Sequence, residues 1–262
     1  MLALEHPLPR DQPGFFHRTP VVALGVLAAA WALAVAALPA AGARVAGLAA
    51  VQGALLGTAL AWTSTRERRD RWAPLEAALL LGGAATGALL LTWGALAYAA
   101  MPAWLAWRRR AWLTAFTAAP VPALAAGALF GALLGAHLLV NASLTFGYHV
   151  RAGSWAELVG WWAYDLGANA LAAEAFFRGA LFERARRRWS FTAATALATA
   201  ASVARYLVDP LLPRSLEIAA GAAFYLVLLG SGNCWLLALT GSLGPPLAAA
   251  ACFFCAYRLL AR

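Results

Sequence analysis

Two ionisable residues, Glu174 and Arg178, lie four positions apart inside a long apolar stretch of the chain. A charged group in the middle of a membrane span costs about 2.5–3.5 kcal/mol on insertion scales, so each such group is a candidate for function. In an α-helix this spacing puts both side chains on one face, where a carboxylate could activate water for hydrolysis. The alternative is a structural ion pair that neutralises itself, and charge placement alone favours that alternative.

A second polar pair, Asp165 and Asn169, precedes Glu174 on the same apolar stretch. At about 100° per residue, this pair falls on roughly the opposite face of an α-helix from Glu174. The helix is therefore predicted to be polar on two sides, and both sides must face protein or water. Arg205 is expected to extend to the membrane surface, and Glu217 to begin a helix, where an acid suits the positive end of the helix dipole.

Two further patterns contain residue types that can do chemistry. His137 and Asn141 form an H-x-x-x-N on one helical face, and His137 could assist Glu174 if their two helices pack together. The alternative is a buried histidine that hydrogen-bonds across helices. Cys252 and Cys255 form a C-x-x-C with no second ligand pair nearby, so we predict small buried side chains there, with no metal and no cofactor.

The composition places all of these residues in a membrane. Of the 262 residues 63% are hydrophobic and 12% are charged, whereas an average soluble domain is roughly 45–50% apolar. The apolar residues fall in blocks of about 20, the length that a helix needs to cross a hydrocarbon core. Because backbone polar groups in lipid must bond within their own segment, we predict an all-α, polytopic transmembrane helix bundle.

We predict about eight helices in three regions of the chain. Residues 1–20 form a polar arm, 21–150 the first four helices, and 151–262 a core of four more. Trp and Arg residues in Met101–Trp112 predict a segment at the membrane interface. The first apolar run is longer than a signal-peptide h-region, so we expect it to be retained. The helices are predicted at about Val21–Ala41, Val45–Trp62, Pro74–Ala100, Pro122–Asn141, Trp155–Arg184, Phe191–Val208, Leu216–Leu239, and after the turn 240–246 to near Arg258.

The net charge of +9 comes from arginines that cluster at the ends of the apolar blocks. This placement predicts contact with membrane lipids and argues against nucleic acid as a partner. Alternation of eight spans puts Arg66–Arg71 opposite both Arg108–Arg110 and Arg184–Arg188, so the positive-inside rule does not fix the orientation. Arginine without lysine is typical of a GC-rich bacterial genome, which favours a bacterial inner (plasma) membrane.

Residues 173–179 read A-E-A-F-F-R-G and are followed by a basic run. This segment resembles the E-E-x-x-x-R-G motif of the CAAX-protease and bacteriocin-processing (Abi) family of intramembrane endopeptidases. Downstream, residues 230–243 resemble the glycine-containing helix and the T-G-S-L turn that precede the family's last core helix. The order, spacing and helical setting of both motifs agree over about residues 155–260.

The resemblance implies a catalytic set that this chain does not carry. In the family the first Glu is the water-activating base, a His on the next helix assists it, and an H-x-x-x-N on the last core helix stabilises the oxyanion. Loss of one oxyanion donor typically costs about 10²–10³ in rate, and loss of the base about 10²–10⁴ more, so we expect no hydrolysis by the family's route. The corresponding positions hold Ala173 for the first Glu, Ala201–Tyr206 without a histidine, and about Ala250 and Phe254 for the last His and the Asn.

The expected function is that of a catalytically degenerate family member, a pseudoenzyme. It would bind a hydrophobic or membrane-anchored protein segment, or pair with an active protease, and the remnant Glu–Arg pair would hold its core together. One alternative is an active intramembrane endopeptidase that uses Glu174 with His137. Another is a small-solute transporter lined by Asp165, Asn169 and Asn233, although the sequence lacks the paired broken segments typical of transporters.

Overall fold

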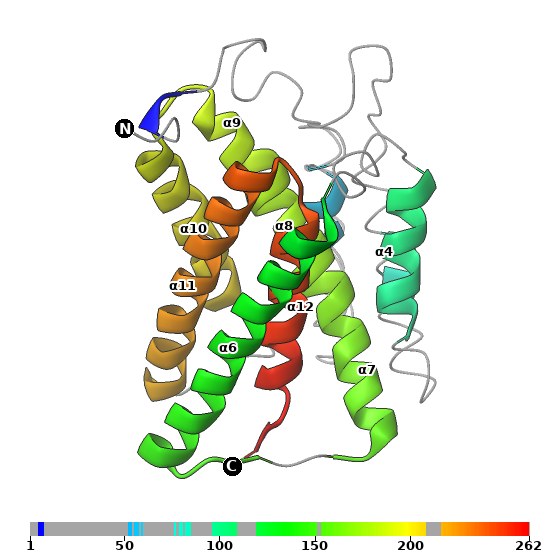
Figure 1. Ribbon diagram of the computed structural model, residues 1–262. Coiled ribbons are helices and arrows are strands. Elements are labelled where there is room, and N and C mark those ends of the chain that lie inside the picture. The colour runs from blue at the N-terminus through cyan, green and yellow to red at the C-terminus, as the bar shows by residue number, and fades with distance from the viewer. Residues whose placement is uncertain are drawn as a thin grey trace, which may run out of the picture.

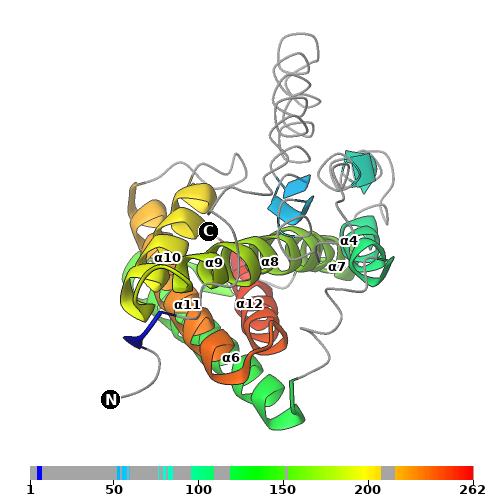
Figure 2. The same ribbon diagram turned by 90° about the horizontal axis from the view of Figure 1, so that it is seen from above.

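A computed structural model describes residues 96–108, 119–150, 153–207 and 216–261, together with 5–7 and parts of 52–59 and 76–84. The long helices pack into a bundle in which the segments 121–146 and 155–186 slant in opposite directions (Figure 1), and the view from above shows other helices gathered along the segment 155–186 (Figure 2). The helices are α4 (Ala97–Arg108), α6 (Val121–Phe146), α7 (Trp155–Asp165), α8 (Ala173–Phe176), α9 (Glu183–Arg186), α10 (Phe191–Leu207), α11 (Leu216–Thr240) and α12 (Gly244–Tyr257).

Helices α7, α8 and α9 are parts of one continuous helical segment. It begins at a capping box, in which the Glu157 amide donates to Ser154 Oγ at 3.4 Å and the Ser154 amide donates to Glu157 Oε2 at 3.2 Å. Two π-helical stretches, Leu166–Ala172 and Phe177–Phe182, join its three α-helical parts. Such i→i+5 turns occur frequently at functional sites, and here they flank Glu174 on both sides.

Helix α6 packs along α12 with almost no side-chain layer between the two backbones. Gly127, Gly131 and Gly135 are buried on one face of α6. A Cβ atom at Gly127 or Gly131 would overlap the carbonyl oxygen of Pro245 or Ala249 on α12. Small residues spaced by four permit this close approach of membrane helices.

The turn between α11 and α12 depends on one glycine. Gly241 has a φ of 65°, a left-handed conformation that favours glycine, and its amide donates to Leu237 O at 2.8 Å. Pro245 and Pro246 follow in the first turn of α12, where missing amide donors are tolerated. The T-G-S-L sequence therefore ends one helix and starts the next within four residues.

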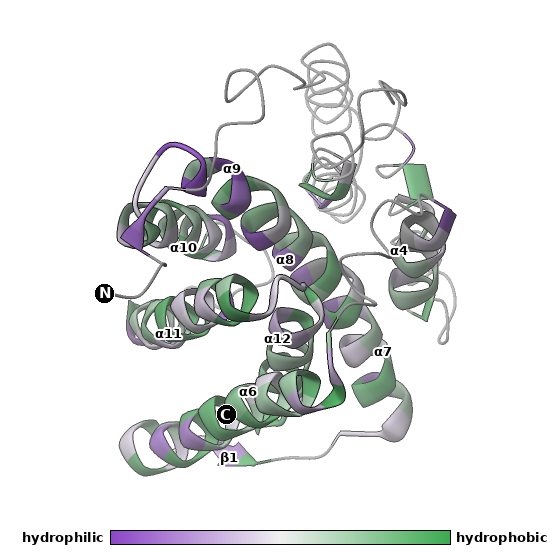
Figure 3. Cartoon of the chain, turned by 45° about the horizontal axis from the view of Figure 1, so that its top comes forward, coloured by the Kyte–Doolittle hydropathy of each residue, from purple (hydrophilic) through white to green (hydrophobic). Residues whose placement is uncertain are grey.

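Two of the described helices are long and apolar enough to cross a membrane, Val121–Phe146 and Ala219–Thr240. Hydropathy colouring shows that α6 and α11 are largely hydrophobic, whereas hydrophilic residues mark α9 (Figure 3). Large apolar side chains point outward from α6, with Leu133 62% and Leu144 82% exposed. The predicted all-α class is confirmed for the described residues, where the only strand pairing joins His149–Val150 to Leu260–Ala261. The count of eight spans stays a prediction.

The N-terminal half contacts the core through α4 and a helical piece near Gln52. Helix α4 covers most of the stretch predicted as an interfacial segment and extends beyond Ala100, where the third helix was predicted to end. Its Arg108 pairs with Glu76 at 2.8 Å and stacks on Trp104 at 5.3 Å. Gln52 Nε2 donates to Tyr164 Oη at 2.9 Å and thereby joins this half to α7. The first predicted helix and the loop 66–71 lie outside the described residues.

Candidate functional site

Glu174 and Arg178 lie together at the centre of the bundle. Glu174 is on α8 and Arg178 on the π-helical stretch that follows, and the two residues are only 3% and 1% exposed. Glu174 Oε2 lies 3.3 Å from Arg178 Nε. Neither of these two atoms forms a hydrogen bond with any described residue. The contact is therefore a buried ion pair held by charge more than by hydrogen-bond geometry.

The neighbouring helices hold the Arg178 guanidinium in place. Arg178 Nη1 donates to Ser202 Oγ on α10 at 3.1 Å. Gly230 on α11 leaves room for the guanidinium, because a Cβ at this position would overlap Arg178 Nη2. Asn233, one helical turn further on, is within hydrogen-bonding reach of the Glu174 carboxyl group. Gly230 and Asn233 thus both contribute to the surroundings of the ion pair, Gly230 by leaving space for Arg178 and Asn233 by its position beside Glu174.

The two polar pairs of this helix share one face, contrary to the prediction that they point in opposite directions. Asn169, Glu174 and Arg178 all line one small cavity. The prediction assumed 3.6 residues per turn throughout, whereas Leu166–Ala172 is π-helical. Because a π turn uses more residues, the nine positions from Asp165 to Glu174 return to nearly the same side of the helix.

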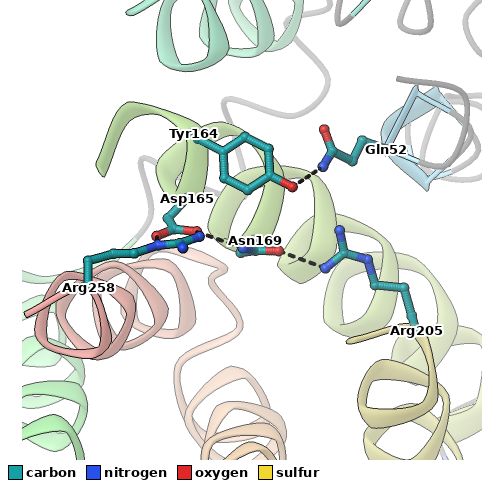
Figure 4. Close-up of polar contacts among 6 residues, drawn as sticks. All are labelled: Gln52, Tyr164, Asp165, Asn169, Arg205 and Arg258. Atoms are coloured by element: carbon teal, nitrogen blue, oxygen red, sulfur yellow. Dashed lines mark hydrogen bonds and ion pairs between the residues drawn. The ribbon is translucent and has the colours of Figure 1, made fainter. Parts of the chain in front are cut away.

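A polar chain crosses the bundle beside this site (Figure 4). Arg258 binds both carboxylate oxygens of Asp165, with Nε at 2.6 Å from Oδ2 and Nη2 at 2.9 Å from Oδ1. Asn169 Nδ2 donates to Asp165 Oδ1 at 2.7 Å, and Asn169 Oδ1 accepts from Arg205 Nη1 at 2.6 Å. The network joins α12, α7 and α10 through residues that are far apart in the sequence.

Arg205 is therefore not directed to the membrane surface, as its position near the end of α10 suggested. Its guanidinium points inward because Asn169 offers an amide oxygen at that depth. A buried hydrogen bond to a charged donor typically stabilises by about 1.5–3 kcal/mol, which favours this arrangement over an extended side chain. Glu217, in contrast, is exposed at the beginning of α11, as expected.

The cavity beside Glu174 measures about 20 Å³, which is room for about one water molecule. Ala173, Arg205 and Phe254 line it together with Glu174 and Arg178. The resemblance assigns catalytic groups to four positions of this chain. Three of these positions, Ala173, Arg205 and Phe254, thus lie around the Glu–Arg pair. The fourth, Ala250, is fully buried on α12. None of the three lining side chains at those places can accept a proton from water as a general base.

His137 has a partner of its own. Its Nδ1 lies 2.8 Å from Tyr225 Oη on α11, and Tyr225 Oη also lies 3.4 Å from the His137 carbonyl oxygen. The histidine is exposed on α6, a helix that packs against α12 and α11. Asn141, the second residue of the H-x-x-x-N pattern, accepts from Thr145 Oγ1 at 3.0 Å. The structure thus brings Glu174 and Arg178 together and places His137 with Tyr225.

No group of three or more His, Cys, Asp or Glu side chains in the described part of the chain is placed to hold a metal ion. Cys234, Cys252 and Cys255 are free thiols. Asn233, which was considered as a residue lining a solute path, donates through Nδ2 to Pro246 O at 3.3 Å.

The sequence did not predict the parts of three residues in the site. Ser202 accepts a hydrogen bond from Arg178, Gly230 leaves room for the Arg178 guanidinium, and Arg258 binds Asp165. Arg258 follows the last residue of α12, where a cation would ordinarily be assigned to the membrane surface. The carboxylate of Asp165, 93 positions earlier, holds it inside the bundle. Gly230 carried a usable signal, since a glycine inside an apolar helix often marks a close approach.

Asp165→Asn is expected to lower the free energy of unfolding by about 1–3 kcal/mol, because Arg258 loses its bidentate acceptor. The effect is limited because the Arg258 side chain is 16% exposed and can turn toward water. Equilibrium unfolding in detergent micelles measures the change. Tryptophan emission should shift too, since the Arg258 guanidinium lies 4.5 Å from the Trp161 ring. Glu157→Gln serves as control, because Glu157 is the exposed N3 acid of the capping box and glutamine also suits that position. An unchanged stability would contradict the role of the Asp165–Arg258 contact.

Comparison with known proteins agrees with the motif-based resemblance. Residues 154–254 match a family model described as "Type II CAAX prenyl endopeptidase Rce1-like". The match begins at the N-cap of α7 and ends within α12, so it includes Glu174, Arg178 and every residue of the polar chain except Arg258. No curated protein and no solved structure matches the chain. The two apolar helices fit the integral membrane character of that family.

Proposed function

Because residues 154–254 are an Rce1-like, CAAX-protease-like segment, we propose that the chain is a catalytically degenerate member of that group of membrane proteins. It binds a hydrophobic or membrane-anchored protein segment, or partners an active protease, without cutting a peptide bond. The observation that carries this proposal is the lining of the 20 Å³ cavity, where Ala173, Arg205 and Phe254 stand around Glu174 and Arg178.

The size of the cavity supports the loss of activity. A hydrolytic site needs a water molecule, a base, and space for the carbonyl carbon that the water attacks. Space for about one water molecule excludes a peptide bond from the vicinity of Glu174. The Phe254 ring packs there among buried aromatic and aliphatic side chains, where it supplies bulk and no hydrogen-bond donor.

The Glu–Arg pair supports the same conclusion from its electrostatics. A carboxylate that acts as a base must be free to accept a proton from water. The Glu174 carboxylate instead faces the Arg178 guanidinium at 3.3 Å, with Asn233 also in reach. The guanidinium is thus the counter-ion of this carboxylate. The role of Glu174 in this arrangement is to neutralise Arg178 and hold α8 against α10 and α11.

The binding half of the proposal rests on the surface of the bundle. Helix α11 exposes Phe224, Trp235 and Leu239, which are 54%, 50% and 54% exposed. An apolar helix face inside a membrane can pack against another membrane-embedded segment, and association there depends on van der Waals contact. The description of the matched family names a CAAX prenyl endopeptidase.

A cleavage-and-capture experiment tests both halves. The purified protein in lipid nanodiscs is incubated with a library of lipid-anchored tail peptides that carry a photo-crosslinker. We expect some peptides to crosslink to the protein and none to show a new terminus by mass spectrometry. Cleavage that disappears in a folded Glu174→Gln variant would overturn the degenerate assignment. A library that is neither crosslinked nor cleaved would contradict the binding role.

A further inference from the structure

A second and much larger cavity, of about 490 Å³, lies between α6, α10, α11 and α12. It sits near the end of the bundle where α6 ends and α11 begins, away from the basic α9 (Figure 1). Tyr206 and Leu226 line both this cavity and the small one beside Glu174, so they form a wall between the two. The volume is within the roughly 300–1,000 Å³ range of small-molecule sites.

Aromatic rings dominate the interior of this large cavity. Tyr206, Tyr225, Phe253 and Tyr257 line it, and Phe253 is only 3% exposed. The phenol groups of Tyr206 and Tyr257 hydrogen-bond to each other, and Tyr225 Oη is bonded to His137. Because these hydroxyl groups are already satisfied within the protein, the interior favours an apolar body over a polar one.

The only described cation in the lining is Arg258, and it is already neutralised. Asp165 holds two of its nitrogens at 2.6 and 2.9 Å, and the Trp161 ring covers its guanidinium at 4.5 Å. An anionic ligand would have to compete with this bidentate, partly buried ion pair. The lining therefore offers no ready counter-ion for a carboxylate or a phosphate.

Polar side chains gather where the lining reaches the surface. Asn141 in the C-terminal part of α6 and Glu217 at the beginning of α11 are both exposed and both line the cavity. Glu217 can only accept hydrogen bonds when ionised, and its charge repels another carboxylate. A head group that donates a hydrogen bond, with a neutral or positive charge, is complementary to this end of the cavity.

We propose that this cavity binds a single long hydrocarbon chain that ends in a hydrogen-bond-donating head, an alcohol or an amine, and rejects the corresponding acid. The hydrocarbon chain lies among the aromatic rings, and the head group lies beside Glu217. The site is separate from the Glu174 cavity, and its occupancy does not require that the protein bind or cleave a peptide.

Photolabelling tests the proposal on the full chain in phosphatidylcholine nanodiscs. The probe is hexadecanol with a diazirine in the chain, and labelled positions are mapped by mass spectrometry. We expect labels on residues of α11 and α12 that line the cavity. Unlabelled hexadecanol and hexadecylamine should displace the probe, whereas hexadecanoate should need at least ten times the concentration. Equal competition by hexadecanoate would overturn the head-group assignment.

Two variants of α11 locate the site. A Cβ at Gly221 meets no atom within 4 Å, so Gly221→Trp can place an indole in the cavity without a backbone clash. This variant should lose at least four-fifths of the labelling. Ala220→Trp, on the exposed face of the same turn, is the matched control and should keep it. Undiminished labelling of Gly221→Trp would overturn the proposal.

A third variant tests the head group. Glu217→Gln removes the charge and keeps the size of this side chain. We expect hexadecanoate to compete within about threefold of hexadecanol in this variant, because the like-charge repulsion is gone. A tenfold preference that persists in Glu217→Gln would contradict the part assigned to Glu217.

Discussion

Glu174→Leu and Arg178→Met, each made alone, are expected to lower the free energy of unfolding by about 3–5 kcal/mol. Each change leaves the other charge buried without a counter-ion, at a site where both residues are almost fully enclosed. Ser202 and Asn233 are neutral groups and cannot replace a full charge. Reversible unfolding in mixed micelles of a mild detergent and SDS, followed by circular dichroism, measures the loss.

The double variant Glu174→Leu/Arg178→Met separates a structural pair from a catalytic one. Replacement of both ions by apolar side chains is often neutral or stabilising, so most of the lost stability should return. The recovery would appear as a coupling energy of several kcal/mol in the double-mutant cycle. Two single variants that each cost less than about 1 kcal/mol would show that the pair does not hold this core.

The helices of the core could be predicted from the sequence almost to the residue. Helix α10 was expected at about 191–208 and covers Phe191–Leu207, and α11 was expected at about 216–239 and covers Leu216–Thr240. The signals were local ones, because Asp209-Pro210 predicted the end of one helix and the glycine turn at 240–246 predicted the end of the next. Such signals act within a few residues, and sequence displays them directly.

Helix α6 shows how a local signal can be misjudged. It was expected to end near Asn141 and continues to Phe146. Thr145 donates to Asn141 within the helix, so the polar residues there do not end it. Gly147, with a φ of 66°, is the actual C-terminal signal. The helix therefore ends just before this glycine, five residues beyond the predicted end.

The polar face of the site could not be predicted, because it depends on π-helical turns. An apolar sequence such as Leu166–Ala172 carries no mark that distinguishes i→i+5 from i→i+4 bonding. The choice is made by packing, since the wider turns let Asp165 and Asn169 reach Arg258 and Arg205. The rotation of the helix and the partners of its polar residues are thus settled together by tertiary contacts.

The Glu–Arg motif, in contrast, could be recognised from the sequence alone. Its two residues are near neighbours on one helix, so their contact required no knowledge of the fold. The structure adds information that the motif cannot give. Ala173, Arg205 and Phe254, which belong to three different helices, line the same small cavity as the Glu–Arg pair. The side chains at these three positions all fit around the same closed cavity.

Gly131→Leu is expected to separate α6 from α12 and to lower the free energy of unfolding by about 3 kcal/mol or more, at the upper end of overpacking effects. A Cβ there overlaps the Ala249 carbonyl oxygen, which belongs to the backbone and cannot turn aside. Gly131→Ala adds only that one atom and should give a smaller loss. The same mixed-micelle unfolding measures both variants.

Ala132→Leu is the matched control for this contact, because Ala132 lies on the exposed face of the same turn of α6. It adds the same kind of apolar side chain toward lipid, where small and large residues are both accommodated, so its stability should stay within about 0.5 kcal/mol of the parent. Equal effects at positions 131 and 132 would mean that α6 is not seated on α12 through its glycine face. A large loss at Gly131 alone would establish this helix pair as a main support of the membrane core.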